Sequence, residues 1–139
     1  DWRRRKLAAD LDADEVVDGA GATDAVGDLT GGSGADVVFD FVGTDATHAG
    51  SLAMLGRGGT YSVIGYGGEI SCQSATLVVN EHAIVGNLVG SWIDLWELVQ
   101  LHAAGRVRLV TETHPLDSVN EVLDKLRDGD VTGRAVLVP

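Results

Sequence analysis

Glycines that directly follow apolar runs are the residues of this sequence that most clearly indicate chemistry. Each closes a buried-strand pattern: Gly43 follows residues 37–42, Gly65 follows 61–64, and Gly90 follows 83–89. Glycine just past a strand lets a ligand approach the backbone. In open α/β sheets the ligand crevice lies at the carboxyl ends of the strands. Three such strand ends in succession predict one side of a nucleotide or dinucleotide site.

Two aspartates, Asp36 and Asp40, bracket the first of these strands on the same face, an arrangement that suggests a carboxylate pair. Burial with a hydrogen-bonding role is the simpler interpretation. We expect Asp40 in particular to hold the loop that borders the ligand edge.

Other residue types give weaker signals. None of the histidines has a second histidine or a cysteine at i+3 or i+4, and none lies in an HExxH pattern, so surface or structural roles are expected for His48, His82, His102 and His114. The single cysteine, Cys72, excludes an internal disulfide and a CxxC metal pattern. The sequence also contains no GxSxG, P-loop or EF-hand pattern. We therefore assign no catalytic residue and no metal ligand.

Strands that alternate with helices must position these residues. We expect strands at 15–18, 37–42, 61–64, 83–89, 108–113 and 134–138, most of them buried on both faces. We expect helices at 2–11, 23–29, 45–55, 92–104 and 118–127, with an extended piece or helical turn between 69 and 81. Thr23, Thr44 and Ser91 are the predicted N-caps, and glycines after Leu55 should end the third helix. This alternation predicts an α/β fold with a parallel sheet.

The composition limits the classes of function. The 139 residues, 45% of them hydrophobic, suffice for one globular domain or part of a larger one. A formal net charge of −11 disfavours nucleic-acid binding, which needs a basic face. We expect no membrane contact, because no apolar run approaches the ~20 residues of a spanning helix, and no signal peptide. The single cysteine favours a cytoplasmic setting, and the dispersed acidic charge suggests a salt-adapted protein.

Several motifs together resemble a known family. They are DFVG at 40–43, LxRGGTYxVxGYGG at 55–68, AIVGNLVGS at 83–91, and the closing segment PLDSVNEVLDKLRDGDVTGRAVLVP. The segment LAADLDADEVVD at 7–18 also resembles the family's LAxxLGAxxVVD, with Asp12 where glycine is usual. In order and spacing these motifs are similar to the carboxyl-terminal part of medium-chain zinc-dependent alcohol dehydrogenases.

The resemblance implies a partial doubly wound, Rossmann-type parallel sheet that lacks its first two strands. Residues 1–107 would form part of a dinucleotide-binding domain, and the helix and strand in 108–139 would return to the catalytic domain. The strand at 15–18 would then have no neighbour, so it must pair elsewhere or fray. The strand at 37–42 would gain an open apolar edge, which invites association between molecules.

The resemblance also implies cofactor-binding roles, at the three strand ends and at one arginine. Phe41, Val42 and Gly43 would line the cleft between adenosine and nicotinamide; Ile64, Gly65 and Tyr66 would face the nicotinamide ring; Asn87, Leu88 and Val89 would offer backbone contacts to its carboxamide; and Arg134 would reach the pyrophosphate. A guanidinium suits that last role because it pairs bidentately with phosphate oxygens. The alternative for Arg134 is an exposed arginine before a strand.

Other parts of the family pattern are missing from this chain. The zinc ligands, the substrate pocket, the glycine-rich phosphate turn and the ribose-binding acid all belong to missing segments, and Asp1 is about two residues too late to be that acid. We therefore expect a truncated chain that is inactive alone and binds NAD or NADP weakly. In the parent, zinc would act on the alcohol as a Lewis acid.

The parent would be an NAD(P)-dependent alcohol dehydrogenase that acts on a small-molecule alcohol or carbonyl compound, and the family pattern suggests a homo-oligomer. Two alternatives stay open. One is a zinc-free quinone reductase of the same superfamily. The other is a stand-alone nucleotide-sensing or interaction domain without catalysis.

Overall fold

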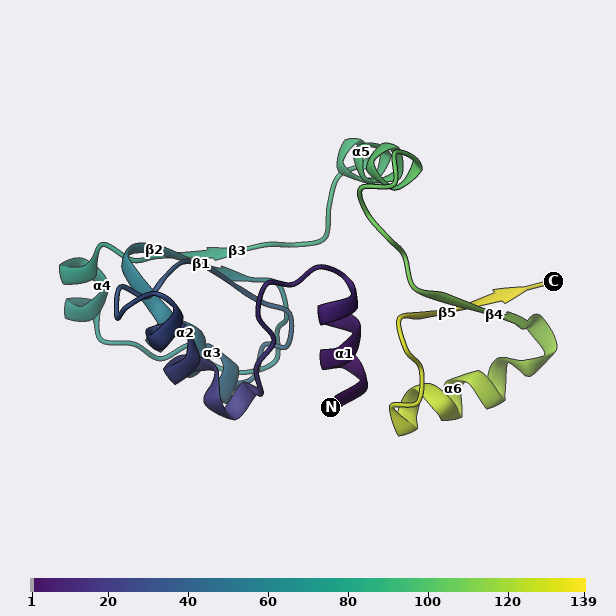
Figure 1. The fold of residues 1–139 in the computed structure, drawn as a ribbon, viewed down its shortest axis with the longest axis horizontal. Coiled ribbons are helices and arrows are strands. Elements are labelled where there is room, and N and C mark those ends of the chain that lie inside the picture. The colour runs from purple at the N-terminus through teal and green to yellow at the C-terminus, as the bar shows by residue number, and fades with distance from the viewer. Residues whose placement is uncertain (1) are drawn as a thin grey trace. The chain divides into compact units, whose positions relative to one another are not determined.

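A computed structural model describes residues 2–139, and Asp1 lies outside the described residues. The chain forms two compact units. We call Val17–Val89 the sheet unit, and residues 2–16 together with Gly90–Pro139 the terminal unit. Each is described by itself (Figure 1).

The sheet unit is built on three parallel strands, β1 (Ala35–Asp40), β2 (Leu55–Val63) and β3 (Ala83–Gly86), in the order β1-β2-β3. Val38 of β1 pairs with Tyr61 of β2, which pairs with Ile84 of β3. Helices α3 (Asp45–Met54) and α4 (Ser74–Asn80) make the two crossovers, and the short η1 (Gly19–Gly21) and α2 (Ala22–Leu29) precede β1. The parallel order confirms the predicted α/β class and a partial doubly wound sheet.

Capping residues explain where helix α3 starts. The Thr44 side chain accepts a hydrogen bond from the Thr47 backbone N–H, and the Thr47 hydroxyl accepts one from the Thr44 N–H, which forms a capping box. The N-cap prediction at Thr44 is therefore confirmed. The helix ends at Met54, as expected to within a residue.

The glycines after Leu55 do not end the helix by forming a loop, as the sequence suggested, but lie inside β2. A Cβ on Gly56 would lie 2.3 Å from the carbonyl oxygen of Ser33, so the backbone of β2 packs in direct contact with the turn before β1. The ladder between β1 and β2 also shifts its register between Ala35 and Val37. Glycine is needed here for close backbone packing, and a sequence pattern does not distinguish that need from a loop.

Helices cover one face of the sheet, whereas the side chains of β1 on the other face are exposed. Helices α2 and α3 lie side by side on one face (Figure 1), and Tyr61 is fully buried there. On β1, Val37 and Phe39 point the other way and are 48% and 62% exposed. The prediction that these strands are buried on both faces is therefore wrong for β1 within this chain. The open apolar edge predicted for this strand is confirmed, because β1 is the end strand of the described sheet.

Several predicted boundaries need correction. Residues 15–18 form no strand in the described chain, because no neighbouring strand supplies hydrogen bonds to them. Helix α2 begins at Ala22 with Gly21 in the N-cap position, rather than being capped by Thr23. Strand β3 stops at Gly86, so residues 87–89 lie outside it and form an irregular segment. The ambiguous segment before it contains a helix, α4.

The terminal unit contains α1 (Trp2–Asp10), α5 (Trp92–Ala103), β4 (Thr111–Pro115), η2 (Leu116–Ser118), α6 (Val119–Asp128) and β5 (Arg134–Val138). Strands β4 and β5 pair in parallel through the α6 crossover, and Val122 and Val131 are buried beside them. Ser91 and Asp94 form a second capping box at α5, as predicted for Ser91. Strand β4 begins and ends later than expected.

Among residues 2–139, no helix combines the length and the apolar character that crossing a membrane requires.

Candidate functional site

The carboxyl ends of β1, β2 and β3 bring three segments to one edge of the sheet. We call residues 41–43, 64–68 and 87–89 the carboxyl edge. The backbone N–H groups of Ile64 and Gly65 both donate to the Asp40 carbonyl, at 2.9 and 2.8 Å. The Gly68 N–H donates to the Gly43 carbonyl at 2.8 Å, and the Asn87 N–H donates to Val63 at 2.9 Å. One backbone hydrogen bond therefore joins the first two segments, and the second and third are each bonded to the end of the neighbouring strand.

Glycine is required where the first two turns meet. Gly43 has φ +72°, and a Cβ there would lie 2.2 Å from the carbonyl carbon of Gly65. A Cβ on Gly65 would lie 2.5 Å from the carbonyl carbons of Phe41 and Val42. These glycines allow the turns to approach each other, which is a different reason from the predicted approach of a ligand. Gly90 is not constrained in this way, since its nearest contact would be the Asp94 side chain at 3.5 Å.

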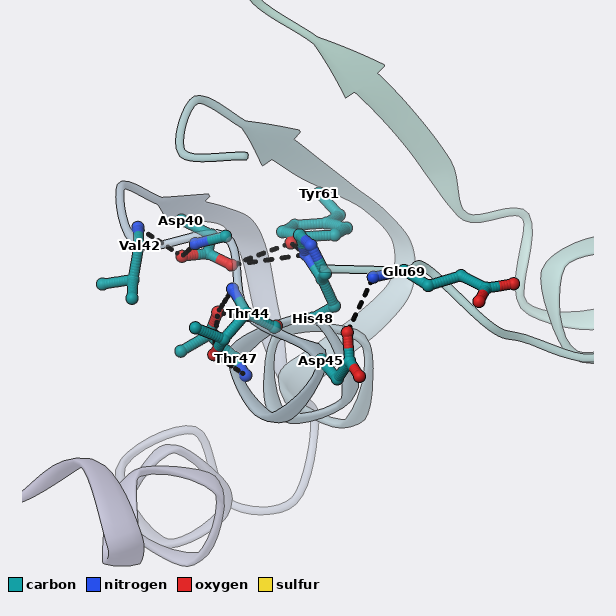
Figure 2. Close-up of polar contacts among 9 residues, drawn as sticks. Asp40, Val42, Thr44, Asp45, Thr47, His48, Tyr61 and Glu69 are labelled. Carbon is teal, nitrogen blue, oxygen red and sulfur yellow. Dashed lines mark hydrogen bonds and ion pairs between the residues drawn. The ribbon is translucent and has the colours of Figure 1, made fainter. Parts of the chain in front are cut away.

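An open crevice of about 490 Å³ lies between these two turns and the start of helix α3. It is lined by Val42, Gly43, Thr44, Asp45, Ala46, Tyr66, Gly67 and Gly68. The Asp45 carboxylate accepts a hydrogen bond from the Glu69 N–H at 2.7 Å, which fixes the far end of the 64–68 turn on the helix (Figure 2). The crevice therefore has two backbone walls with defined positions.

A buried polar network lies directly beneath the first turn (Figure 2). Asp40, His48 and Tyr61 come from β1, α3 and β2 and are 5%, 2% and 0% exposed. One Asp40 carboxylate oxygen accepts the Val42 and Gly43 N–H groups at 2.8 and 3.1 Å. The other accepts the Tyr61 hydroxyl at 3.0 Å, and the Tyr61 oxygen lies 2.5 Å from His48 Nδ1. The predicted loop-holding role of Asp40 and the structural role of His48 are both confirmed, whereas Asp36 is exposed.

The electrostatics of this network define its hydrogen positions. Burial alone would raise the pKa of Asp40, but the Thr47 hydroxyl, the two backbone N–H groups and the Tyr61 hydroxyl outweigh it and lower that pKa below 3.8. Burial and the adjacent Asp40 carboxylate raise the pKa of Tyr61 to about 12. Because an ionised carboxylate only accepts, Tyr61 donates to Asp40, and its oxygen accepts the hydrogen that His48 carries on Nδ1.

The carboxyl edge unites the predicted cofactor-binding residues except one. Its three segments carry Phe41, Val42, Gly43, Ile64, Gly65, Tyr66, Asn87, Leu88 and Val89. The Asn87 side chain donates to Ser62 Oγ at 2.8 Å and to the Val85 carbonyl at 3.1 Å, which ties the third segment to the sheet. Val89 has φ +39°, a strained conformation for a β-branched residue.

Arg134 is the exception. It opens β5 in the terminal unit, where its exposed guanidinium donates to the Gly133 carbonyl at 3.1 Å. Its predicted contact with a pyrophosphate stays a prediction.

Sequence reasoning did not assign the α3 side of the crevice. Thr44, Asp45, Ala46, Gly67 and Gly68 line it without having been named as site residues. The available signal was their position, because residues 44–46 continue the chain after the predicted Gly43 and residues 67–68 continue it after the predicted Tyr66.

The two groups that the resemblance implies fit this chain differently. An open crevice at the carboxyl edge, with backbone walls joined by glycine, suits a nucleotide. Zinc does not fit, because the part of the chain that the structure describes has no group of three histidine, cysteine, aspartate or glutamate residues arranged to hold a metal ion.

Fold and site together define an α/β protein with an open crevice at the carboxyl ends of parallel strands. Comparison with known families makes this more specific. Residues 2–104 match the family described as "Zinc-binding dehydrogenase". The chain belongs to this family.

Individual relatives agree with that assignment. The chain is 33% identical over 132 residues to an NAD-dependent alcohol dehydrogenase of Sulfurisphaera tokodaii, covering 91% of this chain and 38% of the relative. It is 30% identical over 138 residues to a D-arabinose 1-dehydrogenase (NADP(+)) of Saccharolobus solfataricus, covering 99% and 40%. The crystal structure of an alcohol dehydrogenase from Aeropyrum pernix superposes with a TM-score of 0.92 and 41% identity, covering 100% of this chain and 41% of that one. The chain therefore spans between 38% and 41% of the length of these proteins.

Proposed function

We propose that the chain forms the nicotinamide-side wall of the cofactor site in an NAD(P)-dependent alcohol dehydrogenase, which transfers hydride between an alcohol and the nicotinamide ring. The observation that carries the proposal is the crevice at the carboxyl edge. Ligands of open α/β sheets bind outside the carboxyl ends of the strands. Membership of the zinc-binding dehydrogenase family and the dehydrogenase relatives support the assignment of that ligand as NAD or NADP.

The residues of the carboxyl edge would bind and orient the cofactor. Backbone groups at 64–66 and 87–89 would hydrogen-bond its carboxamide, and the exposed Phe41 and Tyr66 would shield it from water. Arg134 would pair with the pyrophosphate. The bound cofactor would supply the hydride chemistry itself.

The proposal assigns zinc to residues outside this chain, because the described residues offer no ligand set. For that reason we expect the 139 residues alone to be inactive. They should also bind the cofactor weakly, since a few backbone hydrogen bonds of about 1 kcal/mol each fall short of the ~8 kcal/mol that micromolar affinity needs.

The proposal extends to the whole protein. Its substrate would be a small-molecule alcohol or carbonyl compound, and it would be a cytoplasmic homo-oligomer. Residues 1–107 would belong to its cofactor domain, and residues 108–139 would return to its catalytic domain.

The test uses the full-length protein that contains this chain. Titration with NAD⁺ and NADP⁺ is followed by protein fluorescence, and alcohol oxidation by the absorbance of the reduced nicotinamide. Val42→Glu places a carboxylate in the crevice and should weaken the binding of the anionic cofactor about tenfold or more. Val79→Glu makes the same charge change on the exposed face of α4 and should leave binding within about twofold.

Two results would argue against the proposal: no binding of either cofactor by the unmodified protein, or equal weakening by the two variants. Nicotinamide-linked reduction of a quinone by a metal-free preparation would favour the quinone reductase instead.

A further inference from the structure

We propose that Asp40 is the positioning residue of the cofactor crevice, which its buried carboxylate shapes by holding the 41–43 turn against the sheet. The inference rests on the proposed function, and it assigns a task in that function to a residue that does not touch the crevice. Asp40 does not line the crevice between the two turns, and it is only 5% exposed.

Two N–H groups of the 41–43 turn point toward the sheet. Backbone N–H groups at the end of a strand ordinarily point to water or to a ligand. Here the Val42 and Gly43 N–H groups point inward to one oxygen of Asp40, at 2.8 and 3.1 Å. The carboxylate therefore fixes the conformation of the turn from below and leaves its outer surface for the cofactor.

The carboxylate is itself held by buried contacts with two other elements. Its other oxygen accepts the Tyr61 hydroxyl from β2 at 3.0 Å, and His48 Nδ1 of α3 lies 2.5 Å from that hydroxyl and 3.5 Å from the carboxylate. All three side chains are buried. Through Asp40, the position of the turn therefore depends on two other elements. These are the central strand β2 and helix α3, whose start borders the crevice.

Gly43 connects the turn to the opposite wall of the crevice. Gly43 packs against the backbone of Gly65, and its carbonyl accepts the Gly68 N–H at 2.8 Å. A shift of Gly43 therefore moves both walls of the crevice. A carboxylate that only stabilised the core would not be linked to the walls of the crevice. Its replacement would then lower stability without changing cofactor affinity, whereas replacing a positioning carboxylate should change both.

The experiment compares three variants of the full-length protein in NAD(P) titrations at a temperature where circular dichroism shows each to be folded. Asp40→Asn keeps an acceptor oxygen in place and loses the charge, so its Kd should stay within about threefold of the unmodified protein. Asp40→Glu keeps the charge and displaces the acceptor, and Asp40→Ala removes it. Both should raise the Kd for the cofactor about tenfold or more.

Tyr61→Phe is the matched control for a structural role. It removes one hydrogen bond from the same buried carboxylate but leaves both bonds to the turn, so it should lower the melting temperature and raise the Kd far less than Asp40→Ala does. Unchanged cofactor affinity in folded Asp40→Ala or Asp40→Glu would overturn the inference. If neither of these folds, the Asn variant decides, and a tenfold loss of affinity there would overturn it as well.

Failure of the unmodified protein to bind NAD(P) would count against the proposed function and not against this inference. Hydrogen exchange then provides the readout. The Val42 and Gly43 amides should exchange faster in Asp40→Glu than in Asp40→Asn, while the amides of the terminal unit exchange equally in both. Equal exchange at Val42 and Gly43 would contradict the positioning role.

Discussion

The ionisation of the Tyr61 hydroxyl should make the free energy of unfolding depend on pH. Its folded-state pKa is raised to about 12 from an ordinary 10.0, mainly by burial and then by the Asp40 carboxylate. A raised pKa means that the stabilisation is fully present below pH 10 and is lost as the pH rises through 12. We expect Tyr61→Phe to cost about 1–3 kcal/mol near neutral pH, because Asp40 and His48 lose a buried partner.

Urea unfolding of both proteins at successive pH values checks this prediction. The gap in unfolding free energy between them should narrow from pH 10 toward pH 12. The exposed Tyr66 is common to both proteins and cancels in the difference. A gap that stays constant over this range would show that Tyr61 is not the titrating group.

Gly43 offers a second prediction at this scale. Alanine there combines a left-handed φ of +72° with a Cβ that would lie 2.2 Å from the Gly65 carbonyl carbon. We expect Gly43→Ala to destabilise the protein by more than about 2 kcal/mol, because backbone must move to relieve the clash. The control is Gly50→Ala in helix α3, where a Cβ meets nothing within 4 Å. That change should be neutral or stabilising by up to about 1 kcal/mol, and equal losses at both positions would refute the argument.

Residue identity alone identified some of these sites and missed others. Gly43 and Gly65 were identifiable because a glycine that follows an apolar run has few other uses. Their physical task was not, because the sequence does not show that the two turns touch. The partnership of Asp40 with Tyr61 and His48 joins residues of three different elements, and no local pattern encodes it.

Helix α3 carries a prediction at the scale of the element. Thr44 caps it through a side-chain hydrogen bond to the Thr47 N–H at 3.3 Å. Thr44→Ala should cost about 1 kcal/mol in unfolding free energy, because an N-terminal N–H loses its acceptor. Gln73 occupies the same position in α4 and makes no capping bond, so Gln73→Ala should change stability by less than about 0.5 kcal/mol. Similar losses for the two variants would contradict this assignment.

The free edge of strand β1 leads to a second prediction at the scale of the element. Val37 and Phe39 are about half exposed or more on the end strand of the described sheet, which offers unpaired backbone to a second chain. We expect the 139-residue chain to self-associate and Val37→Lys with Phe39→Lys to weaken that association. Sedimentation velocity over a concentration series measures it. Val79→Lys on α4 adds the same kind of charge away from the edge and should leave association unchanged.

The elements themselves were largely predictable, and the errors share one cause. Helices α3 and α5 begin where their caps predict, because a capping residue acts within its own turn. The strand expected at 15–18 fails because a strand exists only with a partner. The start of β2 at Leu55 was missed because its glycines look like a loop in the sequence. In the structure Gly56 is needed because the Ser33 backbone leaves no room for a side chain.

At the scale of the whole molecule, the dominant quantity is a formal net charge of −11 spread along the chain. Self-repulsion of this kind opposes the compact state, and salt weakens it by shortening the Debye length from about 10 Å at 0.1 M to about 3 Å at 1 M. We expect the unfolding free energy at neutral pH to increase steadily between these concentrations of potassium chloride. This is the behaviour of a salt-adapted protein.

A second pH separates charge screening from the general strengthening of apolar burial by salt. Near pH 4.5, the isoelectric point calculated from the sequence, repulsion is small and only the general effect should remain. The gain in stability from salt should therefore be clearly smaller at pH 4.5 than at pH 7. No gain at molar salt, or an equal gain at both pH values, would show that the acidic surface does not destabilise this fold and would remove the argument for adaptation to salt.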